Sequence, residues 1–274
     1  MSKFWFVTGS SRGLGRDIVV AALEAGDTVA ATARNANDLD DLVEQYGQRV
    51  LPLALDVTDA DAVEKAIAVA KSVFGRIDVV VNNAGYANTA AVEDITLDDF
   101  KKQVDTNFYG TVYVSKAAVP ILREQGAGHI FQIASVGGRI ASVGLAPYQA
   151  AKFAVRGFSL VLAQEVAPLG IKVTTVQTGG MRTDWAGSSM EIPEISEPYQ
   201  QTVGQFAKML RDGSGSEHAD PKKIAKAIVD LAGRDDAPAE ILMGADAYEY
   251  AQKAAEAVAE SDRKWKDVTT SVAF

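Results

Sequence analysis

The sequence lacks the residues that most often carry covalent and metal chemistry. It contains no cysteine, which excludes disulfides, thiolate nucleophiles and cysteine-ligated zinc. Its only histidines are His129 and His218, which are too few and too far apart in the chain for a histidine metal site. We therefore expect no bound metal.

Basic charge and long apolar runs are also scarce. Acidic residues number 36 against 27 lysines and arginines, for a formal net charge of −9, so counterion release from nucleic acid is a poor driving force for binding. No uncharged apolar run reaches the roughly 18 residues that a membrane span needs. The first residues also lack the pattern of a signal peptide. These absences predict a cytoplasmic protein whose partners are neither nucleic acids nor membranes.

What the 274 residues do contain is a regular alternation of short apolar segments with segments of helical periodicity. The expected strands cover residues 4–7, 29–34, 50–55, 77–81, 129–133, 173–177 and 241–243. The expected helices cover residues 13–25, 39–46, 60–74, 98–124, 148–166 and 221–232. Continuously apolar strands that alternate with helices predict an α/β fold, a doubly wound parallel sheet of the Rossmann type with ligands beyond the carboxyl ends of its strands.

Two segments stand outside this alternation. Residues 186–218 contain two prolines and a Gly/Ser stretch, and a long irregular segment of this kind is often a lid. Residues 246–274 are expected to be a helical extension of a single catalytic domain, residues 1–245, and to pack on the body or on a second subunit. Apolar side chains in and near the lid predict either an apolar substrate pocket or packing against the body. They are Met181, Trp185, Met190, Ile192, Ile195, Tyr199, Phe206 and Met209.

A glycine-rich turn joins the first expected strand to the first expected helix. A bound phosphate needs backbone N–H groups that no side chain covers and the positive end of a helix, and Gly9, Gly13 and Gly15 meet both needs. With Ser11, Arg12 and Leu14 between the glycines, the turn is a candidate dinucleotide site. Its spacing is GxxxGxG rather than GxGxxG, and glycines that merely allow a tight turn are the alternative.

The end of the second expected strand bears on the type of cofactor. Enzymes that use NAD usually carry an acidic residue there for the ribose 2′-hydroxyl, whereas this chain has Arg34 and Asn35. Guanidinium groups suit a 2′-phosphate, and Arg34 together with Arg12 could clamp one. The sequence therefore favours NADP(H), against the alternative that both arginines are solvated surface charges.

The same turn also fits GxSxG, the nucleophile elbow of α/β-hydrolases. Ser11 would then be the nucleophile, and His218 is the only histidine late enough in the chain to serve as its base. His218 lies in a flexible polar stretch, and the turn follows the first strand of the chain. A hydrolase is therefore a minor alternative.

Three polar side chains suggest how a proton is moved. Tyr148 and Lys152 lie one helical turn apart, so the lysine is placed to lower the phenol pKa from its usual value near 10. Ser135, just past an expected strand, could hold a substrate oxygen, with Ser142 as an alternative serine. Proton donation by a tyrosine while a hydride reaches carbon would reduce a carbonyl to an alcohol.

In this order, the motifs resemble those of the short-chain dehydrogenase/reductase (SDR) family over residues 3–245. The matching segments are Thr8 to Gly15, Asp56-Val57, Asn82-Asn83-Ala84-Gly85, Asn107, Ser135, and Tyr148 to Lys152. The resemblance implies that Tyr148 is the general acid/base, that Ser135 polarises the carbonyl, and that Lys152 binds the nicotinamide ribose. It further implies that Asn107 holds a water of the proton relay.

The resemblance also implies cofactor contacts. Asp56 and Val57 would lie at the adenine, and Asn83, Ala84 and Gly85 would line the ribose. As alternatives, Asp56 could be a helix cap, and Asn82 and Asn83 could be turn formers.

After the sixth strand the family usually has Pro-Gly and then a threonine at the nicotinamide. This chain has Thr178 in place of the proline, followed by Gly179 and Gly180. Cofactor contacts of Gly179, Met181 and Thr183 are therefore expected in an altered turn.

The family usually associates through its two long helices, so a homo-oligomer, a dimer or a tetramer, is expected, with a small-molecule carbonyl or alcohol as substrate. A non-catalytic NADP-binding sensor or scaffold of the same fold is the alternative to an enzyme.

Overall fold

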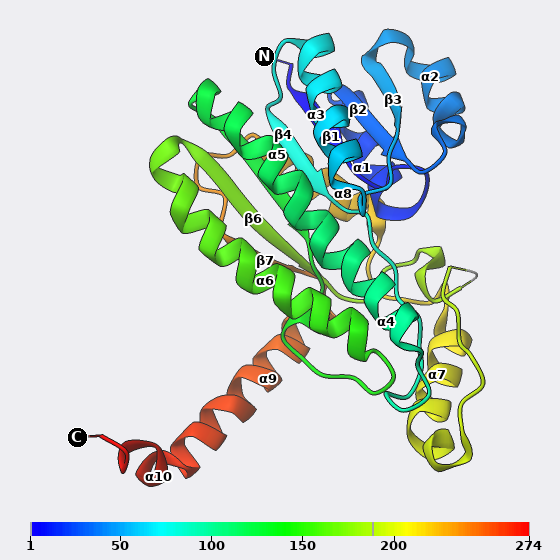
Figure 1. Ribbon diagram of the computed structural model, residues 1–274, viewed down its shortest axis with the longest axis vertical. Coiled ribbons are helices and arrows are strands. Elements are labelled where there is room, and N and C mark those ends of the chain that lie inside the picture. Colours follow the sequence, from blue (N-terminus) through cyan, green and yellow to red (C-terminus); the bar gives the residue numbers. More distant parts are fainter. Residues whose placement is uncertain (1, 188, 274) are drawn as a thin grey trace.

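A seven-stranded parallel sheet lies at the centre of the computed structural model, which describes residues 2–187 and 189–273 (Figure 1). Its strands are β1 (Phe4–Val7), β2 (Thr28–Ala33), β3 (Val50–Ala54), β4 (Val79–Asn82), β5 (Gly128–Ile133), β6 (Ile171–Thr178) and β7 (Glu240–Met243). Their order is β3-β2-β1-β4-β5-β6-β7. The direction of winding reverses between β1 and β4, and ligands of doubly wound sheets bind at this switch point. The predicted fold class is confirmed.

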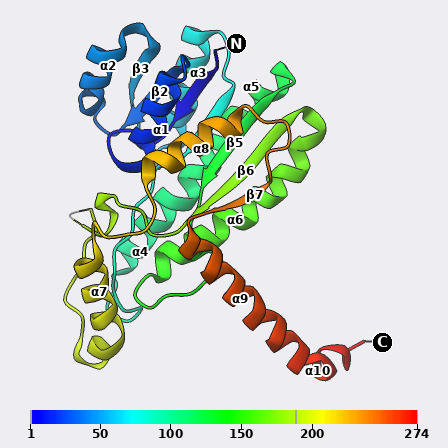
Figure 2. The ribbon, with the colours of Figure 1, turned by 180° about the vertical axis from the view of Figure 1, so that it is seen from behind.

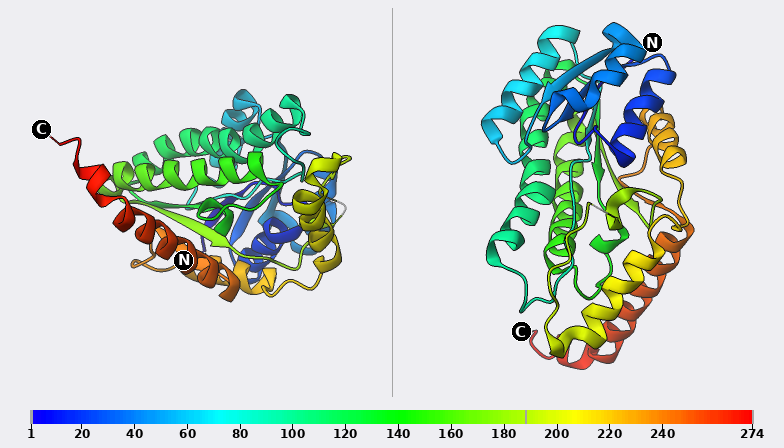
Figure 3. Two further views of the ribbon diagram at one scale, coloured as in Figure 1. Left: turned by 90° about the horizontal axis from the view of Figure 1, so that it is seen from below. Right: turned by 90° about the vertical axis from the view of Figure 1, so that its right-hand side faces the viewer.

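Helices cover both faces of the sheet (Figures 1 and 3). The helices of the described chain are α1 (Gly13–Glu24), α2 (Asp40–Tyr46), α3 (Ala60–Phe74), α4 (Leu97–Val104), α5 (Gly110–Gln125), α6 (Ala146–Val166), α7 (Gln205–Gly213), α8 (Pro221–Ala232), α9 (Ala245–Lys264) and α10 (Lys266–Thr270). Of these, α7, α10 and most of α9 lie away from the sheet (Figures 1 and 2). Side chains alternate along each strand, so Trp5 and Val7 pack in the core under α1 and α8, while Phe6 packs in the core under α3, α5 and α6. Burial on both faces explains why the central strands β1 and β4 are almost entirely apolar.

Local signals fix several helix ends where the sequence predicts them. Helix α3 begins after Asp59, whose carboxylate accepts a hydrogen bond from the N–H of Ala62, and ends at Gly75 with φ of 78°. Helix α8 begins after Asp220 with Pro221 in its first turn. Both helices have the predicted bounds.

The single long helix predicted over residues 98–124 is instead two helices joined by a π-helical turn, Asp105–Tyr109. Within this turn the Asn107 side chain donates a hydrogen bond of 2.8 Å to the carbonyl of Gln103, four residues earlier. A side chain thus occupies an acceptor of the backbone ladder, and π-helical turns inside helices frequently mark functional sites.

The segment expected to be irregular, residues 186–218, contains helix α7 and several shorter helical turns. The guanidinium of Arg211 on α7 donates to the carbonyls of Ala186, Gly187 and Met190 and so closes the segment on itself. It joins the body where the N–H of Thr89 donates to the carbonyl of Glu191. Met1, Ser188 and Phe274, which fall within the expected domain and lid ranges, lie outside the described residues.

The predicted C-terminal helix projects from the body as an arm (Figures 1 and 2). Only the first two turns of α9 pack on the body, where Ala247 and Ala251 are buried against Val136 and Leu242. Beyond Ala251 the helix is largely exposed, and packing on a second subunit stays a prediction. None of the helices in the described chain is both long enough and apolar enough to cross a membrane.

Candidate active site

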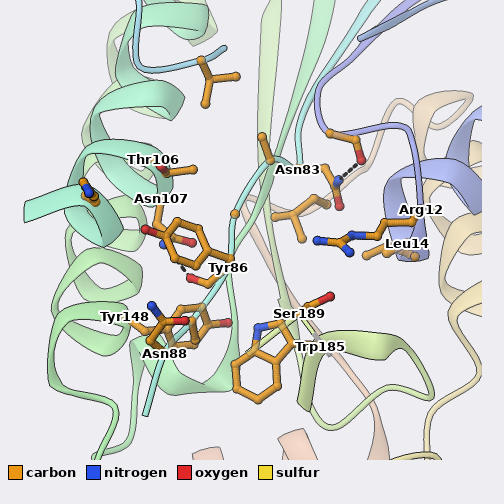
Figure 4. A pocket seen from close by; sticks show the side chains of 18 of the residues that line it. Arg12, Leu14, Asn83, Tyr86, Asn88, Thr106, Asn107, Tyr148, Trp185 and Ser189 are labelled. Carbon is orange, nitrogen blue, oxygen red and sulfur yellow. Dashed lines mark hydrogen bonds between the residues drawn. The ribbon is translucent and has the colours of Figure 1, made fainter. Parts of the chain in front are cut away.

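A cavity with a volume of about 880 Å³ opens at the carboxyl ends of the central strands (Figure 4). Most of the predicted site residues line it: Gly9, Ser11, Arg12, Gly13, Leu14, Arg34, Asp56, Val57, Asn83, Ala84, Gly85, Asn107, Tyr148, Lys152, Met181 and Thr183. Four others, Gly15, Asn35, Ser135 and Gly179, are not among the residues that line it. The chain therefore brings residues separated by up to 174 positions (183 − 9) to one cavity.

The glycine turn is held by the loop that follows β4. Asn83 donates from its side-chain amide to the carbonyls of Thr8 and Gly9, each at 3.0 Å, and its N–H donates to the Thr8 hydroxyl. Gly9 has φ of 67°, and a Cβ on Gly15 would overlap the Gly9 carbonyl. Asn83 thus has the turn-forming role, and Gly15 leaves space for this contact.

Two arginines near the glycine turn have unpaired guanidinium groups. Arg12 and Arg34 are exposed and line the cavity, and their guanidinium groups form no hydrogen bond or ion pair within residues 2–187 and 189–273. Arg12 reaches into the open space (Figure 4). By contrast, nearby Arg16 is paired with Asp41. Unpaired guanidinium groups beside a glycine-lined helix N-terminus fit the phosphates of a dinucleotide.

Neighbouring predicted residues have local partners. Asp56 accepts hydrogen bonds from the N–H and the hydroxyl of Thr58 at 2.9 and 2.8 Å, whereas the cap of α3 is Asp59. Asn35 accepts from the N–H of Asn37 and caps a short helical turn. Both side chains stabilise the loops that carry them, and of the two only Asp56 lines the cavity.

The polar side chains expected to move a proton meet on the opposite wall. Tyr148 and Lys152 lie on α6, with the lysine Nζ 5.6 Å from the centre of the tyrosine ring. The Lys152 ammonium donates to the carbonyl of Ile133 at 2.8 Å. Ser135 follows β5, where its hydroxyl accepts from the N–H of Gly137 at 3.0 Å. Strand β5 therefore fixes both the serine and the lysine.

Asn107 completes this wall from the π-helical turn. Its amide donates to the carbonyls of Tyr86 and Gln103, each at 2.8 Å, while its Oδ1 is buried without a hydrogen-bond partner in the described part of the chain. A Cβ on Gly85 would lie 2.5 Å from this oxygen and 3.6 Å from the Lys152 Nζ. The Asn107 Oδ1 can accept a hydrogen bond, and the Lys152 ammonium has N–H groups besides the one that binds Ile133. A water between them could bond to both.

The titration behaviour of the pair differs from the sequence expectation. Burial raises the pKa of Tyr148 to about 12, and the hydrogen bond with the Ser135 hydroxyl acts in the opposite direction but is the smaller effect. Burial lowers the pKa of Lys152 to about 8. The lysine was expected to lower the tyrosine pKa, but its ammonium donates to the Ile133 carbonyl, and the tyrosine pKa is set by burial and the Ser135 hydrogen bond. Tyr148 is therefore a protonated phenol, suited to donate a proton.

An apolar cluster surrounds the tyrosine. The Trp185 ring lies 5.4 Å from the Tyr148 ring at an interplanar angle of 57°, and Met190 is buried beside both. Ile192 and Phe206 pack against this cluster. Met209, by contrast, is 59% exposed, so only part of the predicted apolar set encloses the site.

Sequence reasoning missed two residues of the wall, Tyr86 and Asn88. Both line the cavity near Tyr148 (Figure 4). Asn88 donates to Asp99 at 2.9 Å and accepts from the N–H of Glu191, and so ties α4 to the apolar segment. Their position just beyond Gly85, near the carboxyl end of β4, was the signal that could have identified them.

The hydrolase alternative finds no support in this geometry. Ser11 lines the cavity, but no histidine of the described chain does. Ser11 therefore has no histidine base there.

Comparison with known proteins agrees with the architecture. A family model described as short chain dehydrogenase matches residues 3–192. The chain belongs to the short-chain dehydrogenase family. The SDR chain is 58% identical over 274 residues to the oxidoreductase BOA17 of Botryotinia fuckeliana, with 100% of each chain covered. It is 36% identical over 269 residues to an uncharacterized oxidoreductase of Schizosaccharomyces pombe, covering 97% of this chain and 90% of the relative.

A solved structure resembles the whole SDR chain, including its arm. It is a short-chain dehydrogenase from Streptomyces avermitilis that is 35% identical, with a TM-score of 0.93 and 100% of each chain covered. A short-chain type dehydrogenase/reductase from Mycobacterium marinum is 28% identical, with a TM-score of 0.75 over 88% of this chain and 93% of that one. The full coverage of the first structure includes the projecting C-terminal helix.

Proposed function

We propose that this SDR protein is an NADP(H)-dependent oxidoreductase that interconverts a ketone or aldehyde with the corresponding alcohol. The observation that carries the proposal is one cavity with two chemically distinct ends. Tyr148, Lys152 and Asn107 gather at one end, and the unpaired Arg12 and Arg34 stand at the other. A proton donor and an anion site that share a cavity suit reduction by a phosphate-bearing hydride carrier.

The side chains divide the work as follows. The Tyr148 hydroxyl donates a proton to the carbonyl oxygen, and Ser135 orients that oxygen. The nicotinamide, when bound, supplies the hydride. Lys152 would hold the ribose hydroxyls of the cofactor, and a water between Lys152 and the Asn107 Oδ1 would return the proton to Tyr148 from solvent. In the oxidative direction the same groups accept the proton.

The preference for NADP(H) rests on the two arginines. A 2′-phosphate is a dianion, and two guanidinium groups with no other partner can neutralise it by charge-assisted hydrogen bonds. The residue that follows β2 is Arg34, where an NAD-dependent enzyme would carry a carboxylate.

An apolar carbonyl compound is the substrate class that the wall favours. Trp185 and Met190 lie beside the catalytic tyrosine, where they would exclude water from the reacting carbonyl. A relative that is 33% identical over 234 residues, covering 85% of this chain and 84% of its own, is named 3-ketodihydrosphingosine reductase, from Bacteroides thetaiotaomicron. Its name describes reduction of a ketone.

Association into a dimer or tetramer belongs to the same proposal. Tyr109, Phe153 and Val161, near or on the long helices α5 and α6, are 44 to 55% exposed, which leaves apolar surface for another subunit. Residues 246–274 are an extension of the catalytic domain 1–245 in this proposal. A light-scattering mass equal to one chain would contradict the oligomer and leave the chemistry untouched.

The direct test is Tyr148→Phe. Oxidation of NADPH by a panel of apolar ketones and aldehydes should fall by about 10²-fold to 10⁴-fold, the usual contribution of a general acid, while NADPH binding by fluorescence stays measurable. Tyr250→Phe, on the exposed arm, is the matched control and should retain full activity. Full activity of Tyr148→Phe would contradict the role of Tyr148. Tight NADPH binding by the wild type without reduction of any carbonyl would favour the sensor alternative.

A further inference from the structure

The first turn of the projecting arm touches the loop that follows β6. Asp246 on α9 accepts a hydrogen bond of 2.8 Å at Oδ2 from the N–H of Gly180. Its other oxygen, Oδ1, is buried and has no hydrogen-bond partner among the described residues. Burying a carboxylate oxygen without a partner costs free energy, so the arrangement calls for a reason beyond stability.

The backbone makes room for this carboxylate on two sides. A Cβ on Gly179 would overlap both oxygens of Asp246, and a Cβ on Gly244 would lie 2.5 Å from Oδ1. Gly244 also has φ of 125°, a conformation that disfavours other residues. The close approach of the carboxylate to the loop is therefore built into the backbone at both contact points.

The same loop leads into the cavity. The N–H of Gly179 donates to the carbonyl of Met243 at 3.0 Å, and the carbonyl of Gly180 accepts from Ala219 at 3.1 Å. Met181 and Thr183, which follow at once, line the cavity on the side of the glycine turn. A shift of Gly180 would therefore move the part of the wall that faces the nicotinamide in the proposed function.

We propose that Asp246 is a positioning residue that holds the Gly179-Gly180 loop in the form that seats the nicotinamide half of the cofactor. The inference rests on the proposed function. Thr178, the last residue of β6, has no ring to lock its φ as a proline would. The hydrogen bond from the Gly180 N–H to the Asp246 carboxylate restrains the loop instead. The restraint would account for the direction of the Gly180 N–H, which points toward α9.

The test separates the two halves of the cofactor. NADPH and 2′,5′-ADP are titrated against wild type, Asp246→Ala, Asp246→Asn and Glu249→Ala, since 2′,5′-ADP has the adenosine half without a nicotinamide. Loss of one charge-assisted hydrogen bond should weaken NADPH binding by Asp246→Ala about tenfold and leave 2′,5′-ADP binding unchanged. Asp246→Asn keeps an oxygen for the Gly180 N–H and should recover most of the affinity. Glu249→Ala removes an exposed carboxylate one turn later and should match wild type.

Equal weakening of both ligands would show a merely structural role and overturn the inference, as would unchanged NADPH binding by Asp246→Ala. If Asp246→Ala does not fold, Gly179→Ala replaces it, because its methyl group would displace the carboxylate from the loop. The same selective loss of NADPH binding is expected. Failure of the wild type to bind either ligand would instead refute the proposed cofactor, and with it the basis of the inference.

Discussion

Both ends of the sheet carry buried titratable side chains beside a cavity. Among the described residues, however, only the carboxyl end has two such groups with shifted pKa values, Tyr148 and Lys152, one turn apart on a single helix. At the amino end, His129 of β5 is 4% exposed, stacks on Phe131 and bonds to the hydroxyl of Thr174 at 2.9 Å. At the carboxyl end, Tyr148 and Lys152 share a cavity wall with Asn107. All three titratable groups have pKa values shifted by burial. A shifted pKa therefore reports burial, and a nearby cavity does not by itself indicate function, since His129 also lines one with Asp78 and Lys172. What indicates function is that two shifted groups share a wall with an unpaired acceptor, the Asn107 Oδ1.

The hydrogen bonds of His129 favour its neutral form. The Thr174 hydroxyl donates to the carbonyl of Pro238 at 2.7 Å, so it can only accept from the histidine Nε2–H. Nδ1 is then an acceptor that is buried and unpaired among the described residues. Burial, with a smaller repulsion from Lys172, lowers the pKa of His129 to about 3. The ring is held as a neutral core residue.

Of the substitutions that test this contrast between the two ends of the sheet, we expect the largest effect from Lys152→Ala at the carboxyl end. Lys152→Ala should lower kcat for carbonyl reduction by about 10²-fold or more, because the ribose contact and the proton path both depend on this ammonium. In the wild type, reduction should slow as pH rises through about 8, where Lys152 loses its proton. Lys116→Ala, exposed on α5, is the control and should retain wild-type kcat. A wild-type rate in Lys152→Ala would contradict the assignment.

A smaller effect is expected at the cofactor end of the same cavity. Arg34→Glu places a carboxylate where a 2′-phosphate would lie, so NADPH affinity should fall by roughly 10- to 100-fold and NADH affinity should be kept or improved. Fluorescence titration with both cofactors measures the ratio. Arg123→Glu on α5 makes the same charge change away from the cavity. Equal loss in both variants would assign the effect to net charge alone.

Prediction from sequence was most accurate for elements whose start and end are marked by their own capping residues. Helix α3 was predicted with its true bounds, because Asp59 caps its start and Gly75 ends it. The π-helical turn at Asn107 was missed, because the cause is a side-chain bond to Gln103 that leaves the apolar periodicity intact. Helix α7 was hidden by the prolines and glycines on either side of it.

In the candidate site too, residues within short motifs were predictable from the sequence, whereas residues that depend on distant contacts were not. Tyr148, Lys152 and the glycine turn are short motifs, and their meeting at one cavity follows from the parallel topology. Asp246 gives no such signal, since its partner Gly180 lies 66 residues earlier in the chain. The pKa of Tyr148 is raised by burial and lowered less strongly by the Ser135 hydrogen bond, and neither effect follows from the spacing of Tyr148 and Lys152.

The smallest effect is expected at the amino end. The folded pKa of His129 lies below its unfolded value of 6.5, so the unfolded state binds the proton first as pH falls. Stability is fully present above pH 6.5 and should decline between pH 6.5 and about 3, by about 1 to 2 kcal/mol between pH 7 and pH 5. His129→Leu should flatten this part of the profile in urea unfolding and leave kcat unchanged. An unchanged slope would mean that other groups cause the decline.

In the proposed reaction Tyr148 protonates a carbonyl oxygen while NADPH delivers a hydride to the carbonyl carbon. Deuterium tracing tests this most directly, with the transferable C4 position of NADPH labelled and the alcohol product examined by mass spectrometry and NMR. The proposal predicts one deuterium on the carbinol carbon in the wild type and almost no product with Tyr148→Phe. Product that carries no deuterium, or labelled product formed at the wild-type rate by Tyr148→Phe, would contradict it.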